Sequence, residues 1–381
     1  MPAVIAMMKT LSGEIARTDG SLTRGQITFS DKIVEVHEGP ATGNDYILPG
    51  FIDLQVNGSH GIDVMSADAA ALRTLGEKLA REGTTSWLPT AVTAPMERIE
   101  RVHGAISGAI AAARSDPAAA RDSAAIVGMH LEGPFISARR LGAHPRLNLE
   151  PHGDEFERAA ALRELKLVTL APELPGALDA IRRLVGRGVA VSIGHTDATL
   201  EEARAGIGAG ARMFTHLYNA MRPLGHRDPG VIAAALAKSD ARPAIIPDGV
   251  HVHPEMLRLA YVARGMKGLI ITSDKVALAG TGQETALEVG RARARIDRGA
   301  ARLADGTLAG SVISMLDGVR VMVREVGVPI AEAAVMAAAN PAAVGGFKDR
   351  GRLDPGTRAD LIVLSRALEL KAVFIAGREL R

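Results

Sequence analysis

The chain has 381 residues, of which 47% are hydrophobic and 23% are charged, and its formal net charge is +2. This length can bury a sizeable core, either as two ordinary domains or as one large barrel with an appendage. The composition is that of a folded globular protein, and the small net charge without a Lys/Arg block argues against a nucleic-acid partner.

The chain contains no cysteine, which excludes disulfides, thiolate metal sites and a cysteine nucleophile. A metal ion would therefore have to be held by histidine and carboxylate. The first residues lack the basic segment and long apolar core of a signal peptide. No apolar run reaches the roughly 18 residues of a membrane span. We therefore expect a cytoplasmic protein that does not bind a membrane.

Strand and turn signals at both ends of the chain predict one small β domain. Residues 26–29 and 32–36 near the N-terminus have strand-like patterns, as do residues 359–364 and 372–377 near the C-terminus. Domain termini often lie close together. We therefore predict a small β-sandwich domain built from residues 1–47 and 348–381.

Residues 48–347 have a different pattern, in which eight short apolar runs alternate with helix-like segments. Strands that alternate with helices predict a parallel sheet, and eight repeats predict a closed (β/α)8 TIM-like barrel. An open doubly wound sheet is the alternative, but no GxGxxG motif opens any of these units, which disfavours a dinucleotide-binding fold. The predicted strands are residues 51–56, 85–90, 126–131, 167–171, 189–193, 212–216, 244–247 and 269–272, and the predicted helices include 67–81, 97–113, 175–185, 200–209 and 256–263.

Histidine or carboxylate follows most of these strands, at the end where a barrel places its active site. Glu132 ends the third strand, His195 the fifth and His216 the sixth. Two histidines and a carboxylate are a ligand set of catalytic zinc sites, although Fe, Mn and Co accept the same ligands. We therefore predict that Glu132, His195 and His216 bind one divalent metal ion, with zinc as the first choice.

Two other residues at the strand ends have predicted roles. Asp274 follows the last strand, where a carboxylate can take a proton from a water molecule and return it to a leaving group. It would also suit a helix N-cap. His130 lies two residues before Glu132 and on the same strand face. We expect His130 to pack against or support the site rather than to bind the metal ion.

Short motifs from residue 49 to residue 364 carry a family resemblance. They include PGFIDLQVNG (49–58), HLEGPF (130–135), IGHT (193–196), THLYNAM (215–221), DGVHV (248–252), TSD (272–274), LAGS (308–311), ANPA (339–342) and PGTRADLIVL (355–364). Together they resemble the N-acetylglucosamine-6-phosphate deacetylases of the amidohydrolase superfamily. HLEGPF and THLYNAM are specific to that family, whereas the layout of barrel and flanking domain belongs to the superfamily.

The resemblance implies hydrolysis of the acetamide of N-acetyl-D-glucosamine 6-phosphate to D-glucosamine 6-phosphate and acetate, in amino-sugar catabolism or cell-wall recycling. It implies the same three metal ligands, Asp274 as proton acceptor and donor, and His144 as a group that stabilises the oxyanion. In the family an arginine crosses a dimer interface, so the resemblance implies a homodimer in which Arg227 reaches the neighbouring active site. The implied substrate-binding residues are Ala143, His144, Asn219, Ala220, Arg227, Asp248, His251, Leu308, Ala309 and Gly310.

The chain departs from the wider superfamily at two places. Gln55 and Asn57 stand where many amidohydrolases have His-x-His for a second metal ion. Neutral amides are poor substitutes for imidazole, so we expect one metal ion per subunit, and dihydroorotase-like or aminoacylase activities are disfavoured. Lys275 stands where the family usually has a small residue. It would lean towards the substrate or towards solvent, and this leaves the fine specificity open.

Two alternatives to the implied reaction remain. The first is the same reaction on N-acetylgalactosamine 6-phosphate, because the two sugars differ at one hydroxyl and one or two hydrogen bonds decide between them. The second is a non-catalytic barrel that binds a sugar phosphate. The presence of all three metal ligands and of Asp274 argues against this second alternative.

Overall fold

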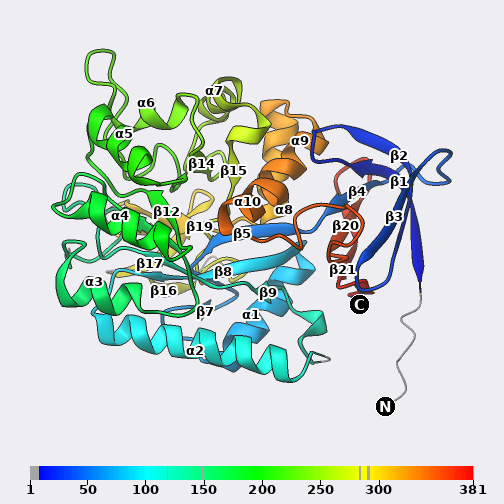
Figure 1. The fold of residues 1–381 in the computed structure, drawn as a ribbon, viewed down its shortest axis with the longest axis horizontal. Helices are drawn as coiled ribbons and strands as arrows, with labels where there is room; N and C mark the ends of the chain where they lie inside the picture. Colours follow the sequence, from blue (N-terminus) through cyan, green and yellow to red (C-terminus); the bar gives the residue numbers. More distant parts are fainter. Residues whose placement is uncertain (1–7, 118, 148, 283–284, 290–291, 381) are drawn as a thin grey trace.

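The computed structural model describes residues 8–380, except residues 118, 148, 283–284 and 290–291. Its centre is a barrel of eight parallel strands surrounded by helices, and a separate sheet made from both ends of the chain lies beside it (Figure 1). The predicted fold class is therefore confirmed. Within the described residues, no helix is both long enough and apolar enough to cross a membrane.

The barrel strands correspond one to one to the eight predicted apolar runs. All of β5 and all but the last residue of β8 are buried, as expected for parallel strands covered on both faces. A bridge between Val56 and Lys275 joins the first strand to the chain just beyond the last. In hydrogen-bonded order the strands are β5 (Phe51–Val56), β8 (Thr84–Val92), β10 (Met129–Glu132), β11 (Leu165–Leu170), β12 (Ala190–Ile193), β13 (Met213–Phe214), β14 (Arg242–Ile245) and β15 (Ile270–Ile271), with β9 (Ala125–Ile126) paired to β8.

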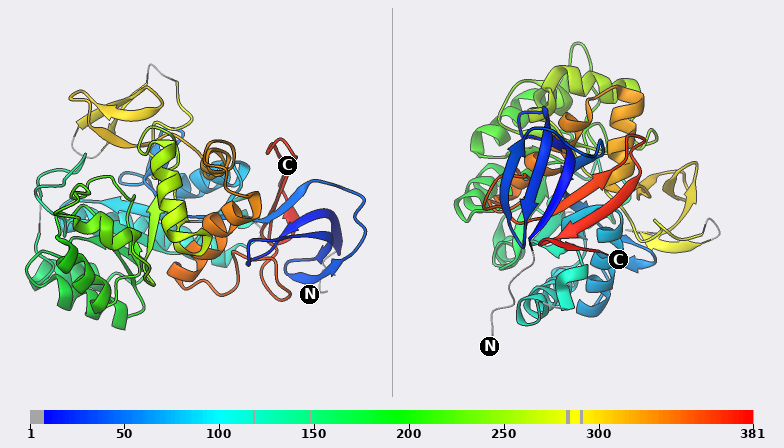
Figure 2. Two further views of the ribbon diagram at one scale, coloured as in Figure 1. Left: turned by 90° about the horizontal axis from the view of Figure 1, so that it is seen from above. Right: turned by 90° about the vertical axis from the view of Figure 1, so that its right-hand side faces the viewer.

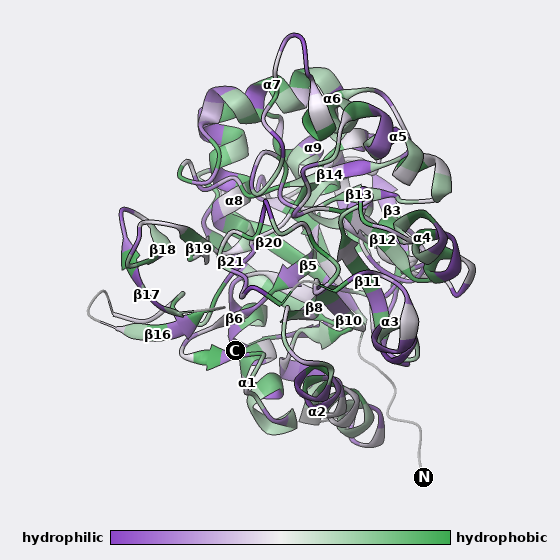
Figure 3. Cartoon of the chain, turned by 90° about the vertical axis from the view of Figure 1, so that its left-hand side faces the viewer, coloured by the Kyte–Doolittle hydropathy of each residue, from purple (hydrophilic) through white to green (hydrophobic). Residues whose placement is uncertain are grey.

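Helices cover the outside of the barrel, and several begin at capping residues. Asp68 accepts a hydrogen bond from the backbone N–H of Ala71, and Thr199 and Glu202 form a capping box. Figure 3 shows polar residues on the outer faces of helices such as α2 and α3. The helices are α1 (Ala69–Arg81), α2 (Met96–Ser115), α3 (Gly153–Ala160), α4 (Ala177–Gly186), α5 (Leu200–Ala209), α6 (Gly230–Leu236), α7 (Pro254–Arg264), α8 (Met315–Val321), α9 (Ile330–Ala334) and α10 (Asn340–Gly345).

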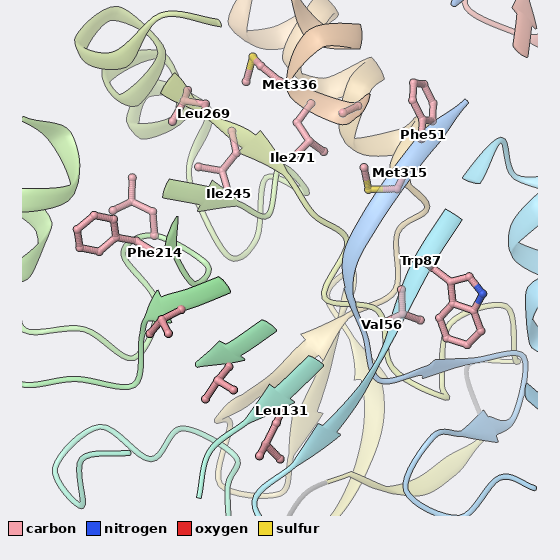
Figure 4. Packing of buried hydrophobic residues seen from close by; sticks show 14 of the residues in the cluster. Phe51, Val56, Trp87, Leu131, Phe214, Ile245, Leu269, Ile271, Met315 and Met336 are labelled. Carbon is pink, nitrogen blue, oxygen red and sulfur yellow. The ribbon is translucent and has the colours of Figure 1, made fainter. Parts of the chain in front are cut away.

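The main hydrophobic core lies between the barrel strands and the surrounding helices. Short 3-10 and π-helical turns join these elements. Figure 4 shows Trp87, Phe214, Ile271 and Met336 among the buried side chains of this core. Asn340 donates from Nδ2 to the backbone oxygens of Met266 and Leu269, which ties the ANPA motif to the start of β15. The short elements are the 3-10 helices η1 (Ala119–Asp122) and η2 (Met266–Gly268) and the π-helical turns η3 (Met322–Val326) and η4 (Val335–Ala339).

The terminal sheet has seven strands and its own core. The C-terminal strand β20 pairs antiparallel with β4, which pairs parallel with the N-terminal strand β1. The sheet curls back on itself (Figure 2). Phe29 and Phe374, from opposite halves of the sheet, meet edge to face with ring centroids 5.3 Å apart. In sheet order the strands are β22 (Arg378–Glu379), β21 (Leu370–Ile375), β20 (Leu361–Leu364), β4 (Tyr46–Pro49), β1 (Lys9–Ala16), β2 (Leu22–Phe29) and β3 (Ile33–Glu38).

A four-stranded antiparallel sheet between β15 and α8 was not predicted from the sequence. It projects from one side of the barrel and is drawn in yellow in Figure 2. The Asp305-Gly306 dipeptide, at the turn between its last two strands, was the local signal that pointed to it. Its strands are β16 (Ala286–Val289), β17 (Ala292–Asp297), β18 (Ala300–Leu303) and β19 (Leu308–Ser311), and a second small hairpin consists of β6 (Gly58–Ser59) and β7 (Ile62–Asp63).

Candidate active site

A cavity of about 260 Å³ lies at the ends of the barrel strands. Parallel strands bring their carboxyl ends to one face of a barrel, so side chains that are far apart in sequence meet there. The structure brings most of the predicted site residues to the wall of this cavity. These residues are Asn57, Glu132, Ala143, His144, His195, His216, Asn219, Ala220, His251, Asp274, Leu308, Ala309 and Gly310.

Three side-chain atoms from the ends of β10, β12 and β13 converge in the cavity. Nε2 of His216 lies 3.1 Å from Oε1 of Glu132 and 3.1 Å from Nε2 of His195. Nε2 of His195 lies 3.3 Å from the same carboxylate oxygen. Tetrahedral ligands at the Zn–N distance of about 2.0–2.1 Å stand roughly 3.3 Å apart, so this triangle has the spacing of a metal-ligand set.

The orientation of the surrounding groups also fits a metal ion. His195 donates from Nδ1 to the backbone oxygen of Arg140 at 2.9 Å, which turns the lone pair of Nε2 towards the triangle. Glu132, His144 and His195 form a second, overlapping group whose ligand atoms lie within 4.8 Å of one another. The cluster of Glu132 and histidines could therefore hold a metal ion.

Burial and mutual contacts set the charge of these ligands. Burial alone would raise the pKa of Glu132, but its contacts with His144, His195 and His216 lower it well below its usual value. Burial lowers the pKa of His195 to about 4. Burial alone would also lower the pKa of His216, but the hydrogen bond and charge of Glu132 raise it. At neutral pH Glu132 is thus ionised and His195 is neutral, the two forms that bind metal ions.

Asp274 faces this cluster from the end of the last barrel strand. Its Oδ1 accepts hydrogen bonds from Nε2 of Gln55 at 2.9 Å and from Nδ2 of Asn57 at 2.8 Å. Nε2 of Gln55 also donates to Oε1 of Glu132 at 2.9 Å. Burial raises the pKa of Asp274 to about 7, and the negative charge of Glu132 adds to this effect. A carboxyl group that titrates near neutral pH can both accept and donate a proton.

The segment that carries Asp274 is held in place by Asp53. The carboxylate of Asp53 is buried in the barrel and accepts from Oγ1 of Thr272 at 2.8 Å and from the backbone N–H of Ser273 at 3.2 Å. The hydroxyl of Ser273 donates to it as well. The TSD motif therefore consists of two residues that anchor the backbone and one that faces the cavity.

The remaining predicted histidines have different surroundings. His144 lines the cavity, with Nδ1 2.8 Å from Oγ1 of Thr93 and Nε2 3.7 Å from Oε2 of Glu132. His130 lies inside the barrel, where its Nε2 is 2.8 Å from Oγ1 of Thr169 and its ring is fully buried. Burial lowers the pKa of His130 to about 4, so it is a neutral residue of the barrel interior and does not contact the cavity.

His251, Asn219 and Ala220 also line the cavity. Nδ1 of His251 lies 2.6 Å from Oδ2 of Asp248, which also accepts the backbone N–H groups of Val250 and His251 at its other oxygen. Asp248 therefore lies behind His251 rather than in the wall itself. Arg227 is exposed and does not line the cavity of its own chain.

Sequence reasoning did not identify several residues that complete the wall. Asp63, Met65 and Val92 line it near β5 and β8, and Val289 and Thr307 come from the four-stranded sheet. Except for Asp63, these residues carry no functional group that suggests chemistry. Their positions depend on how loops fold over the barrel, which no local pattern specifies.

The backbone is left-handed where the chain leaves several strands. His195, His216 and Asp274 have φ angles of 46°, 29° and 49°, and Tyr218 and Ala220 have 78° and 49°. Residues other than glycine adopt this region rarely, although His and Asp enter it more readily than most. Such strained conformations gather at functional sites, and four of these five residues line the cavity.

Comparisons with known proteins agree with this geometry. The amidohydrolase family model matches residues 46–380. N-acetylglucosamine-6-phosphate deacetylase from Bacillus subtilis (strain 168) is 37% identical over 346 residues, which are 88% of this chain and 85% of the relative. N-acetylgalactosamine-6-phosphate deacetylase from Escherichia coli O157:H7 is 38% identical over 370 residues, which are 94% of this chain and 96% of the relative.

Solved structures give the same result. A mutant N-acetyl-D-glucosamine-6-phosphate deacetylase from Mycobacterium smegmatis, in complex with N-acetyl-D-glucosamine-6-phosphate, superposes with a TM-score of 0.89 at 32% identity. The superposition covers 98% of this chain and 99% of the other. The chain therefore belongs to the amidohydrolase family, in the branch of the N-acetylglucosamine-6-phosphate and N-acetylgalactosamine-6-phosphate deacetylases.

Proposed function

We propose that this protein is a metal-dependent hydrolase that removes the acetyl group of N-acetyl-D-glucosamine 6-phosphate, giving D-glucosamine 6-phosphate and acetate. The observation that carries the proposal is the position of Asp274 next to the Glu132–His195–His216 triangle. One hydrogen-bonded amide, that of Gln55, joins the two parts. A metal site and a proton carrier close together at one cavity are the parts that amide hydrolysis needs.

Glu132, His195 and His216 are the residues that would hold the metal ion, one per subunit, and we propose zinc. His216 is preferred to His144 because its ring nitrogen is closer to the carboxylate, at 3.1 Å against 3.7 Å. A bound divalent cation would acidify a water molecule and polarise the acetamide carbonyl. The amides at Gln55 and Asn57 leave the first strand without imidazole ligands for a second ion.

The residues of the chain then account for the proton transfers. Asp274 takes a proton from the attacking water, whose oxygen forms a bond to the acetamide carbon. Its Oδ1 is already engaged by Gln55 and Asn57, so Oδ2 is the proton-carrying atom. An N–H at Nε2 of His144 stabilises the developing oxyanion. Asp274 finally gives its proton to the amine nitrogen as the C–N bond breaks.

The sugar phosphate lies towards the wall that contains Asn219, Ala220 and His251. Ala143, His144 and the Leu308–Ser311 strand enclose the other end of the substrate. Arg227 is exposed outside the cavity of its own chain, and a guanidinium binds phosphate well. We propose that the protein is a homodimer in which Arg227 reaches the phosphate in the neighbouring subunit.

Two further predictions from the sequence stay as proposals. We divide the chain into a barrel domain of residues 48–347 and a small domain of residues 1–47 and 348–381. The pairing of β20 with β4 supports a small domain that contains both ends of the chain. A cytoplasmic location also stays a prediction.

The test is acetate release by metal-reconstituted protein. N-acetylglucosamine 6-phosphate should turn over rapidly, and unphosphorylated N-acetylglucosamine should be a poor substrate. N-acetylgalactosamine 6-phosphate belongs in the same assay, because a relative that is 38% identical is named for that substrate. A preference for the galacto compound would keep the mechanism and change the substrate. No release from any of the three by protein with one metal ion per chain would refute the proposal.

A further inference from the structure

Lys275, the residue after Asp274, is buried in the protein and yet does not face the cavity. Its side chain is 2% exposed, and it is absent from the cavity wall although Asp274 and Val276 on either side line it. Its ammonium instead forms a hydrogen-bonded ion pair with Oε2 of Glu82. Neither of the two orientations expected from the sequence, towards substrate or towards solvent, is therefore correct.

The backbone of Lys275 joins three parts of the barrel. Its carbonyl oxygen accepts the N–H groups of Asn57 at 2.8 Å and Gly58 at 3.1 Å, just after β5. Bridges connect Lys275 to Val56 on one side and to Ser311 of β19 on the other. The barrel thus closes through the residue that follows Asp274.

The same contacts determine where the carboxylate of Asp274 points. Asn57 donates its backbone N–H to Lys275 and its side-chain Nδ2 to Oδ1 of Asp274. Asp274 itself is left-handed, with φ 49°, and such a residue keeps its conformation only where its surroundings fix it. A shift of Lys275 would therefore move Asn57 and Asp274 together.

Glu82 is a suitable anchor for this arrangement. It caps the C-terminal end of α1, where its backbone N–H bonds to the carbonyl oxygens of Leu79 and Ala80. Its other carboxylate oxygen lies 3.9 Å from Nε2 of His60. A buried ammonium without its partner is strongly unfavourable, so the ion pair fixes the Lys275 stem against α1.

We propose that Lys275, through its buried ion pair with Glu82, is a positioning residue that holds the general base Asp274 at the correct place for proton transfer. This inference rests on the proposed deacetylase function. It assigns Lys275 no contact with substrate or metal ion. Its effect is on the reaction step, because misplacing a reacting group by about 1 Å can lower the rate roughly 100-fold.

The experiment compares variants of the full-length, metal-loaded protein at a temperature well below their unfolding transitions. Lys275→Met removes the ammonium and keeps the stem, and Glu82→Asp keeps the charge and shortens the connection. Lys275→Met should lower kcat roughly 100-fold, with KM for N-acetylglucosamine 6-phosphate and metal content unchanged. Glu82→Asp should lower kcat by a smaller factor. Lys275→Arg keeps a positive charge at this position, so its kcat should be close to that of wild type.

The matched control is Lys371→Met, which removes an exposed ammonium that pairs with Asp45 in the terminal sheet and should leave kcat unchanged. If Lys275→Met fails to fold, the kcat of Glu82→Asp decides whether the ion pair positions Asp274. Unchanged kcat in either folded, metal-loaded variant would mean that the ion pair serves stability alone, and would overturn the proposal.

A second readout separates this inference from the proposed function. Crystal structures of wild type and Glu82→Asp should show the hydrogen bond between Asn57 and Asp274 in the first and its loss or lengthening in the second. An unmoved Asp274 would overturn the positioning role. Wild-type protein that releases no acetate would instead refute the proposed function, and the two structures would still decide the positioning role.

Discussion

Nδ2 of Asn57 lies 2.8 Å from Oδ1 of Asp274 and thereby joins the end of the first barrel strand to the end of the last. In a superfamily where imidazoles often occupy the first strand, this chain has an amide that donates to the proposed base. Together with Gln55, it occupies one carboxylate oxygen and leaves the other free.

Replacing Asp274 by Asn should remove the proton carrier and little else. The amide keeps an oxygen that can accept from Gln55 and Asn57, so the site should keep its shape. We expect kcat for N-acetylglucosamine 6-phosphate to fall by about 10²–10⁴-fold, with one metal ion still bound. Steady-state kinetics and metal analysis check this, and a variant with near wild-type kcat would assign the proton transfers to another group.

The stability of the metal-free protein should depend on pH through Asp274. Its pKa is raised to about 7 in the folded protein, so the folded state binds this proton more tightly than the unfolded state. Below the unfolded pKa of about 3.9 the carboxyl group is protonated in both states and has no effect. As pH rises from there to about 7, ionisation favours unfolding and stability falls.

Metal-free Asp274→Asn should therefore be more stable than metal-free wild type at pH 8, by up to a few kcal/mol. Near pH 4 the two proteins should be equally stable. Denaturant unfolding with chelator present measures both values. Equal stability at pH 8 would show that Asp274 is not held in an unfavourable charged state.

Removing a metal ligand should reduce metal binding far more than folding. Glu132→Gln takes away the negative charge at one corner of the triangle, and we expect metal affinity to fall by roughly 100-fold or more, since even indirect supporting groups contribute about 10–100-fold. Competition with a coloured chelator measures the affinity. His152→Gln, at an exposed histidine paired with Glu150, is the control and should bind metal like wild type.

The proposed crossing of Arg227 can be tested by mixing two impaired variants at a low substrate concentration. Arg227→Met should raise KM for the phosphorylated substrate, and Asp274→Asn should lower kcat as described above. In a mixed dimer, the subunit with Met at position 227 keeps Asp274 and receives Arg227 from the partner, so one site of the two is complete. Recovered activity after exchange of subunits supports the crossing, whereas an arginine that acts within its own chain gives no recovery.

The terminal sheet should contribute to stability through its own core. Phe374 is 3% exposed and meets Phe29 across the curled sheet. Phe374→Ala should lower the free energy of unfolding by about 3–5 kcal/mol, from lost burial and the cavity left behind. Val34→Ala, at a residue 49% exposed, is the control and should change it by less than about 0.5 kcal/mol.

The barrel and the ligand residues could be predicted because their signals are local. Buried parallel strands are continuous apolar runs, and the polar residue that follows each run marks the active face, as Glu132, His195 and His216 do. The metal-ligand role itself stays a prediction. The structure shows that the side-chain atoms of these three residues converge on one point in the cavity.

Other features depend on long-range contacts, so no local pattern in the sequence predicts them. Val289 and Thr307 line the cavity although they belong to the four-stranded sheet and not to a barrel strand. The orientation of Lys275 depends on Glu82, which is 193 positions away in the sequence. The short helices α3 and α6 are similar cases, since packing rather than a long helical period defines them.

The left-handed conformations of His195, His216 and Asp274 set stability against activity at these three positions. Each such residue costs of order 1–3 kcal/mol, and glycine would relieve that strain while removing the side chain that the chemistry uses. A search for more thermostable variants should therefore find gains at these positions only with loss of turnover. Greater stability without loss of turnover would therefore have to come from substitutions in the helices and the terminal sheet, with the residues at the strand ends unchanged.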